Sequence, residues 1–229
     1  MMAVWTLAAW LSLCAAPERL SDALALEQRG GDTEALELVE AVVKSRPDWE
    51  IPRLEAARLR LKLGRGLDLA LAHLEAARSL APENPRGHFL YGLLMEERRE
   101  VRTAIDAHEL ALTYRTDYHE ARFRLAGLYF GLGEWALAER HYRICAQAHP
   151  DATGARLQLA TTLERQGKLE DTELELSKLF VAQPKSQVVG RRLVELYERT
   201  GRLHLADKVR RQLGERPRRQ LRELKKSRR

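Results

Sequence analysis

A period of 34 residues runs through this sequence and constrains the fold more than any other feature. Six small residues recur at steps of 35, 34, 34, 34 and 34, and a second set, four prolines and one threonine, recurs at steps of 35, 34, 34 and 34. Both sets have their one longer step at the same place, which predicts a single extra residue in the turn at 48–50. The period defines six units that begin near residues 16, 51, 85, 119, 153 and 187 and end near 215. The small residues are Ala35, Ala70, Ala104, Ala138, Thr172 and Ala206, and the second set is Pro47, Pro82, Thr116, Pro150 and Pro184.

Each unit has the apolar pattern of two helices joined by a short turn. In the fourth unit Ala121, Leu125 and Leu128 recur at helical spacing and form one apolar face. Gly133 is predicted to end that helix with a left-handed residue. Pro150 should end the second helix, because proline cannot continue the backbone hydrogen bonds. A hairpin of this size must stack on its neighbour to bury its apolar face, so the sequence predicts an all-α solenoid.

The fourth unit also resembles a known repeat. Its segment RLAGLYFGLGEWALAERHYRICAQAHP is similar to the tetratricopeptide repeat, a helix–turn–helix of 34 residues with small residues at the close contacts and a closing proline. The third unit, HFLYGLLMEERREVRTAIDAHELAL, matches through Gly92, Ala104 and Ala111 but lacks the glycine and the proline. The fifth unit departs from the pattern at Thr172. The resemblance implies a right-handed α-α superhelix whose first helices line a concave groove for protein partners.

That resemblance places three rows of first-helix residues at the groove. Two rows form a largely apolar strip centred on Phe89 and Phe123, and a third, mostly acidic row flanks it. Burying one Phe contributes about 2 kcal/mol, so a few anchors would hold a protein or peptide with apolar side chains. Alternatively, some of these side chains only pack between neighbouring first helices. The expected contact residues are Leu20, Leu24, Leu59, Phe89, Leu93, Phe123, Phe130 and Leu157, and the acidic row is Glu27, Lys62, Glu96, Phe130, Glu164 and Glu198.

The sequence offers no pattern that predicts catalysis. It has no glycine-rich phosphate loop, no serine nucleophile elbow and no paired-carboxylate motif. His141 and His149 lie near Cys145, but the helix should turn Cys145 inward, and the other histidines fall at unrelated places in the period. The repeats occupy nearly the whole chain. We therefore expect a protein that is not an enzyme and that needs no metal or cofactor.

The first residues, MMAVWTLAAWLSLCAAPERL, predict export. The uncharged stretch is too short for a permanent membrane span and fits the apolar core of a secretory signal, although no Lys or Arg precedes it. Residues 11–14 resemble a bacterial lipoprotein cleavage box, except for Leu13 where a small residue is expected. This box would make Cys14 a lipidation site. Alternatively, residues 1–15 form a packed half-repeat, because Trp5 and Ala8 are in register with the first unit.

The last fourteen residues, RPRRQLRELKKSRR, carry a net charge of +7, whereas the rest of the chain sums to −1. A tail of this kind is usually solvated, and it could contact anionic lipid or nucleic acid. It contains no aromatic residue on which bases would stack, which argues against nucleic acid.

Together these features predict a non-enzymatic scaffold in a bacterial periplasm or outer membrane. It would resemble the six-repeat lipoproteins that assist outer-membrane assemblies, such as the pilotins of type IV pilus secretins. The alternative is a cytoplasmic adaptor or regulatory subunit whose basic tail contacts nucleic acid or an acidic partner.

Overall fold

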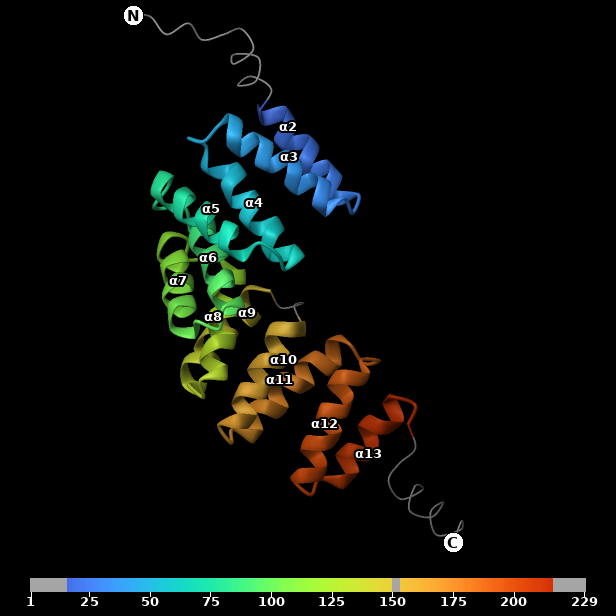
Figure 1. Cartoon of the computed structure of the whole chain (residues 1–229). Helices are drawn as coiled ribbons and strands as arrows, with labels where there is room; N and C mark the ends of the chain where they lie inside the picture. Colours follow the sequence, from blue (N-terminus) through green and yellow to red (C-terminus); the bar gives the residue numbers. More distant parts are fainter. Residues whose placement is uncertain (1–15, 150–152, 216–229) are drawn as a thin grey trace, which may run out of the picture. The chain divides into compact units, whose positions relative to one another are not determined.

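The computed structural model describes residues 16–149 and 153–215, and in that part the chain is all-α (Figure 1). The predicted signal segment with Cys14, the helix-ending Pro150 and the basic tail lie outside the described residues. Twelve helices are described, and they follow one another in pairs with no strand between them. They are α2 (Ala16–Gln28), α3 (Asp32–Ser45), α4 (Glu50–Leu63), α5 (Leu67–Leu80), α6 (Pro85–Glu97), α7 (Val101–Tyr114), α8 (His119–Gly131), α9 (Trp135–Ala148), α10 (Thr153–Arg165), α11 (Leu169–Ala182), α12 (Gln187–Arg199) and α13 (Leu203–Gln212).

The described residues form two compact units, one that ends at Ala121 and one that begins at Arg122. In the first unit α2 packs on α3, α4 on α5 and α6 on α7, and α3 and α5 each pack on the hairpin that follows. In the second unit α10 packs on both α9 and α11, and α12 packs on both α11 and α13. Each hairpin buries its apolar face against a neighbour, which confirms the predicted repeat of helix–turn–helix units.

The six small residues that mark the period are fully buried. Each lies near the start of the second helix of its hairpin, where a larger side chain would push the packed helices apart. Thr172 replaces alanine there without leaving an unpaired polar group, because its hydroxyl donates to the Lys168 carbonyl at 2.8 Å. The six residues are Ala35, Ala70, Ala104, Ala138, Thr172 and Ala206.

The extra residue of the longer step lies in a helix. The connections at 46–49 and 81–84 have the same length, whereas α4 has 14 residues and α6 has 13. Glu50 is the first residue of α4. The insertion therefore lengthens the start of α4 at Glu50. The prediction that the extra residue lies in the turn is wrong, because Asp48 and Trp49 belong to a connection of unchanged length.

A left-handed residue follows the first helix in each of the six described hairpins, and in the second hairpin this residue is Gly64, with φ 62°. Gly133, Gly167 and Gly201 have φ values of 80°, 75° and 73°, which confirms the turn predicted at Gly133. Gly30 has φ 87° in the first hairpin. In the third hairpin Arg99 occupies the same place in the period with φ 62°. Only glycine adopts this conformation without a steric cost, so the third hairpin contains a strained turn.

Arg99→Gly is expected to raise the free energy of unfolding by about 0.5–1 kcal/mol, because it removes the clash of a side chain in the left-handed region. Urea unfolding of the full chain measures this change. The matched control is Arg140→Gly in the exposed middle of α9, which should lower stability by about 1 kcal/mol. A loss of stability in both variants would contradict the strain at Arg99.

Candidate functional site

In the first unit the predicted groove residues divide into two groups. Leu20 and Leu59 are 7% and 1% exposed and belong to a core between α2, α3 and α4. They are buried because this side of each first helix also packs on the next hairpin. Leu24, Phe89 and Leu93 are half-buried and keep part of their surface. Of the five residues predicted here, these three can contact a partner without rearrangement.

Phe89 is held in place by two other rings. Its centroid lies 5.6 Å from that of His108 and 5.0 Å from that of Tyr118, both in tilted contacts. His108 itself is fully buried in α7, and its Nε2 lies 2.8 Å from the Glu96 carboxylate. A ring fixed in this way presents its remaining apolar surface at little further cost in side-chain entropy.

In the second unit Phe123, Phe130 and Leu157 are half-buried. Phe123 packs edge-on against Tyr142 at 5.4 Å, and Phe130 packs edge-on against Trp135 at 4.9 Å. Both phenylalanines cover the core that contains Tyr142, and Leu157 packs against the following core. This unit therefore also carries half-exposed apolar side chains on its first helices.

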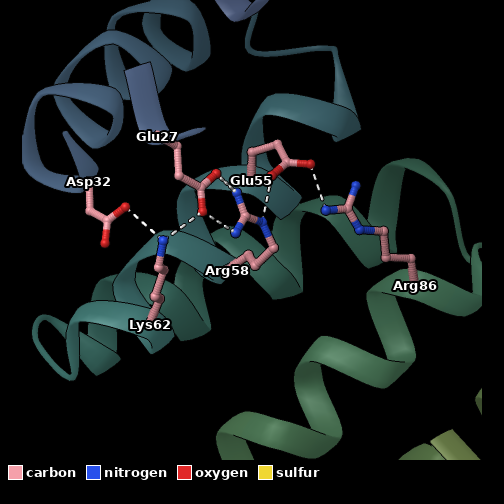
Figure 2. Close-up of polar contacts among 6 residues, drawn as sticks. All are labelled: Glu27, Asp32, Glu55, Arg58, Lys62 and Arg86. Atoms are coloured by element: carbon pink, nitrogen blue, oxygen red, sulfur yellow. Dashed lines mark hydrogen bonds and ion pairs between the residues drawn. The ribbon is translucent and has the colours of Figure 1, made fainter. Parts of the chain in front are cut away.

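The first unit carries a network of ion pairs, and most of its members lie on the first helices (Figure 2). Arg58 is at its centre: Nε donates to Glu55 at 2.7 Å, and Nη1 donates to Glu27 at 2.8 Å, with Nη2 on the second Glu27 oxygen. Glu55 also pairs with Arg86 on α6 at 2.6 Å. Lys62 donates to Glu27 at 3.0 Å and to Asp32 on α3 at 2.7 Å. Three carboxylates meet three cations, so the network is neutral and connects three hairpins.

The carboxylates of the row expected to be an acidic flank have partners within the chain. Glu27 pairs as described above, and Glu96 lies 2.8 Å from Nε2 of His108. Glu164 accepts from Arg192 at 2.9 Å and also from Arg199, and Glu198 accepts from Arg210 at 2.6 Å. The acidic row is therefore not a free acidic surface, because cations on other helices pair with Glu27, Glu164 and Glu198, and the ring of His108 contacts Glu96.

Sequence reasoning missed Arg58 and Arg86. A local signal existed for one contact, since Arg58 follows Glu55 by three residues and lies on the same helical face. The pairing of Arg58 with Glu27 can be predicted only when successive units are aligned with one another. Glu27 and Lys62 occupy equivalent places in successive units, and Arg58 lies one turn before Lys62.

The network depends on a carboxylate that stays ionised in acid. Hydrogen bonds from Arg58 hold the pKa of Glu27 at about 2, against an ordinary value of 4.5. In the second unit burial opposes ionisation of Glu139, but hydrogen bonds from Lys168, Arg143 and Gln166 still lower its pKa to about 2.

A depressed pKa stabilises the fold above pH 4.5, and this contribution disappears as the pH falls from 4.5 towards 2. We expect Glu27→Gln to lower the free energy of unfolding at pH 7 by about 1–2 kcal/mol, after allowance for solvent screening. The loss should shrink steadily below pH 4.5 and vanish near pH 2. Urea unfolding at a series of pH values tests this, with the exposed Glu37→Gln as control. A loss that stays constant with pH would refute it.

No protein-family model and no curated protein sequence matches the chain. Solved structures do match, and they show that its fold is the tetratricopeptide-repeat fold. The PilF structure of Pseudomonas aeruginosa has a TM-score of 0.73 at 15% identity, covering 88% of this chain and 91% of that one. A tetratricopeptide repeat protein from Parabacteroides merdae has a TM-score of 0.67 at 19% identity, covering 85% and 77%. YrrB, described as a tetratricopeptide-repeat protein with an unusual peptide-binding site, has a TM-score of 0.64 at 17% identity, covering 75% and 91%.

Two further findings concern the part of the chain described by the structure. None of its helices has the length and apolar character needed to cross a bilayer. Within residues 16–149 and 153–215 no three His, Cys, Asp or Glu side chains gather as a metal-binding group.

Proposed function

We propose that this chain is a non-enzymatic scaffold that binds a segment of a partner protein on the first helices of its hairpins. One observation supports the proposal most: aromatic and leucine side chains on these helices keep exposed surface although their neighbours are buried. In the first unit these are Leu24, Phe89 and Leu93, and in the second Phe123, Phe130 and Leu157.

The structure also suggests the chemistry of the partner. The ion-pair network centred on Arg58 is neutral, and the carboxylates of the acidic row have partners within the chain. Basic side chains of a partner would therefore gain little binding energy there. Covering the exposed half of one Phe contributes about 1 kcal/mol. A segment with several apolar side chains at helical or extended spacing fits best, and its binding to one unit alone would be weak.

Neighbours in fold provide a precedent for such binding. YrrB is described as having a peptide-binding site, and Cut9 is described in a complex with Hcn1. This chain spans 36% of the length of Cut9, and both likenesses are below 25% identity. They support the class of function and leave the partner to be identified by experiment.

Site-specific cross-linking tests the proposal. A photoreactive phenylalanine analogue replaces Phe89 or Phe123 in the full chain, expressed in its native host. The control position is Leu174, which is 52% exposed on the second helix α11. We expect one partner to be cross-linked at 89 or 123 and not at 174. Equal adducts at all three positions would contradict the proposal, as would normal binding of that partner by a folded Phe89→Ala, Phe123→Ala double variant.

We further propose that the scaffold works in a bacterial envelope, tethered through Cys14, and that it assists assembly of an envelope complex. The support is the apolar sequence before Cys14 and its likeness to a lipoprotein cleavage box. Expression of the full chain in a Gram-negative host, followed by cell fractionation and intact mass measurement, tests both parts. Acylated protein in the membrane fraction, lost in Cys14→Ser, is the expected result. A cleaved, unmodified periplasmic form would remove the tether, and a cytoplasmic form that retains Met1 would refute export.

A further inference from the structure

A second candidate site lies in the first unit. An open pocket of about 360 Å³ lies beside the connection between α5 and α6. Its volume falls within the range of small-ligand sites. Four of its lining residues lie at the end of α5 or in the connection, and the fifth lies on α6. The pocket is lined by Glu75, Arg78, Ser79, Pro82 and His88.

Arg78 supplies the positive charge of this pocket. Its guanidinium lies over the ring of Tyr91, 4.4 Å from the centroid, and its Nε is buried with no hydrogen-bond partner. In the described ranges no carboxylate pairs with it, in contrast to Arg58 and Arg86.

His88 forms the opposite wall and adds no second cation. It is 3% exposed, and its Nε2 donates to the Pro82 carbonyl at 2.6 Å, since a carbonyl oxygen can only accept. Its ring stacks on Tyr114 with centroids 5.4 Å apart. Burial lowers the pKa of His88, which keeps the ring neutral at pH 7. Its Nδ1 has no partner and, because Nε2 carries the proton, can only accept a hydrogen bond, so His88 offers no donor to an anion.

We propose that this pocket, which Arg78 and His88 both line, binds a carboxylate group through the guanidinium of Arg78. A guanidinium fork matches a carboxylate in both charge and geometry. A dianion such as a phosphate monoester fits less well, because only one cation lines the pocket and Glu75 repels two negative charges more strongly than one. The carboxylate belongs either to an acidic side chain of a protein or to a small free acid.

Nuclear magnetic resonance of the full chain tests the site. The imidazole signals of His88, assigned with His88→Gln, and the Nε signal of Arg78 are followed while sodium acetate replaces sodium chloride at constant ionic strength and pH 7. We expect saturable shifts of both signals. Arg78→Gln should weaken the response of His88 at least about tenfold. Arg102→Gln, at an exposed position on α7, should leave it unchanged.

Further titrations settle the ligand. Inorganic phosphate should bind more weakly than acetate. A capped peptide with a single Glu is compared with acetate and with the same peptide carrying Gln. If the Glu peptide binds more tightly than acetate and the Gln peptide does not bind, the site is assigned to a protein partner. If the Glu peptide and acetate bind equally, the site is assigned to a small acid. Equal shifts in chloride, unchanged saturation in Arg78→Gln, or tighter binding of phosphate would each overturn the proposal. None of these results depends on the first-helix surface, so either proposal can fail alone.

Discussion

Gly92→Ala is expected to lower the free energy of unfolding by about 3 kcal/mol, the upper range for overpacking a buried site. A Cβ at this position would lie 2.5 Å from Cε1 and 2.7 Å from Nδ1 of the His108 imidazole. That ring is fully buried and is held by Glu96 and Phe89, so it cannot move aside without breaking those contacts. The predicted loss is net of the intrinsic helical preference for alanine, which is worth about 1 kcal/mol.

A double-mutant cycle separates this clash from other causes. His108→Ala alone leaves a cavity and removes the contact of His108 with the Glu96 carboxylate, and it should destabilise the protein. The double variant Gly92→Ala, His108→Ala should lose clearly less stability than the two single variants lose together, because the added methyl group then has room. Gly154→Ala, where a Cβ would meet nothing within 4 Å, should be neutral or slightly stabilising. Additive losses in the cycle would show that the ring is not the obstacle.

Arg58→Leu is expected to cost about 3 kcal/mol, because it leaves the largely buried carboxylates of Glu55 and Glu27 with one cationic partner each in place of two. Glu55 and Glu27 have side chains that are 6% and 15% exposed, and both accept hydrogen bonds from Arg58. Arg86 and Lys62 remain, but each reaches only one of the two acids. Urea unfolding at pH 7 measures the loss.

Two controls make this prediction specific. Arg102→Leu, at an exposed position, should change stability by no more than about 0.5 kcal/mol. The triple variant Glu27→Gln, Glu55→Gln, Arg58→Leu should recover much of the lost stability, because the two carboxylate charges that Arg58 compensates are then absent. A triple variant as unstable as Arg58→Leu alone would show that Arg58 stabilises through packing of its side chain and not through charge.

The repeat could be predicted from the sequence because its marks are local and periodic. The small residues and Gly133 report on backbone geometry that each hairpin repeats, and the structure places them as expected. Contacts between hairpins were harder to predict. A short stretch of sequence does not reveal that Arg58 pairs with Glu27 or that Arg78 has no carboxylate partner among the described residues. Both features depend on which helices face one another.

The partner surface was only partly accessible to the same reasoning. A periodic row identifies residues that share a place in successive hairpins, but burial also depends on the next hairpin. Leu59 and Leu93 occupy one row, and the first is buried whereas the second is half-buried. The left-handed turn at Arg99 could not be predicted either, because the sequence has an arginine there and glycine is the residue that indicates such a turn.

The network centred on Arg58 also bears on how this chain can be lengthened or shortened. A hairpin that meets its neighbours only through buried small residues can be duplicated or deleted as a 34-residue cassette, because every junction is alike. The first three hairpins are not interchangeable in this way. Glu27 of the first hairpin pairs with Arg58 of the second, and Arg86 of the third hairpin pairs with Glu55 of the second. Removing the middle hairpin would therefore take these partners away from both Glu27 and Arg86. Recombination of this chain should therefore preserve residues 16–114 as one block.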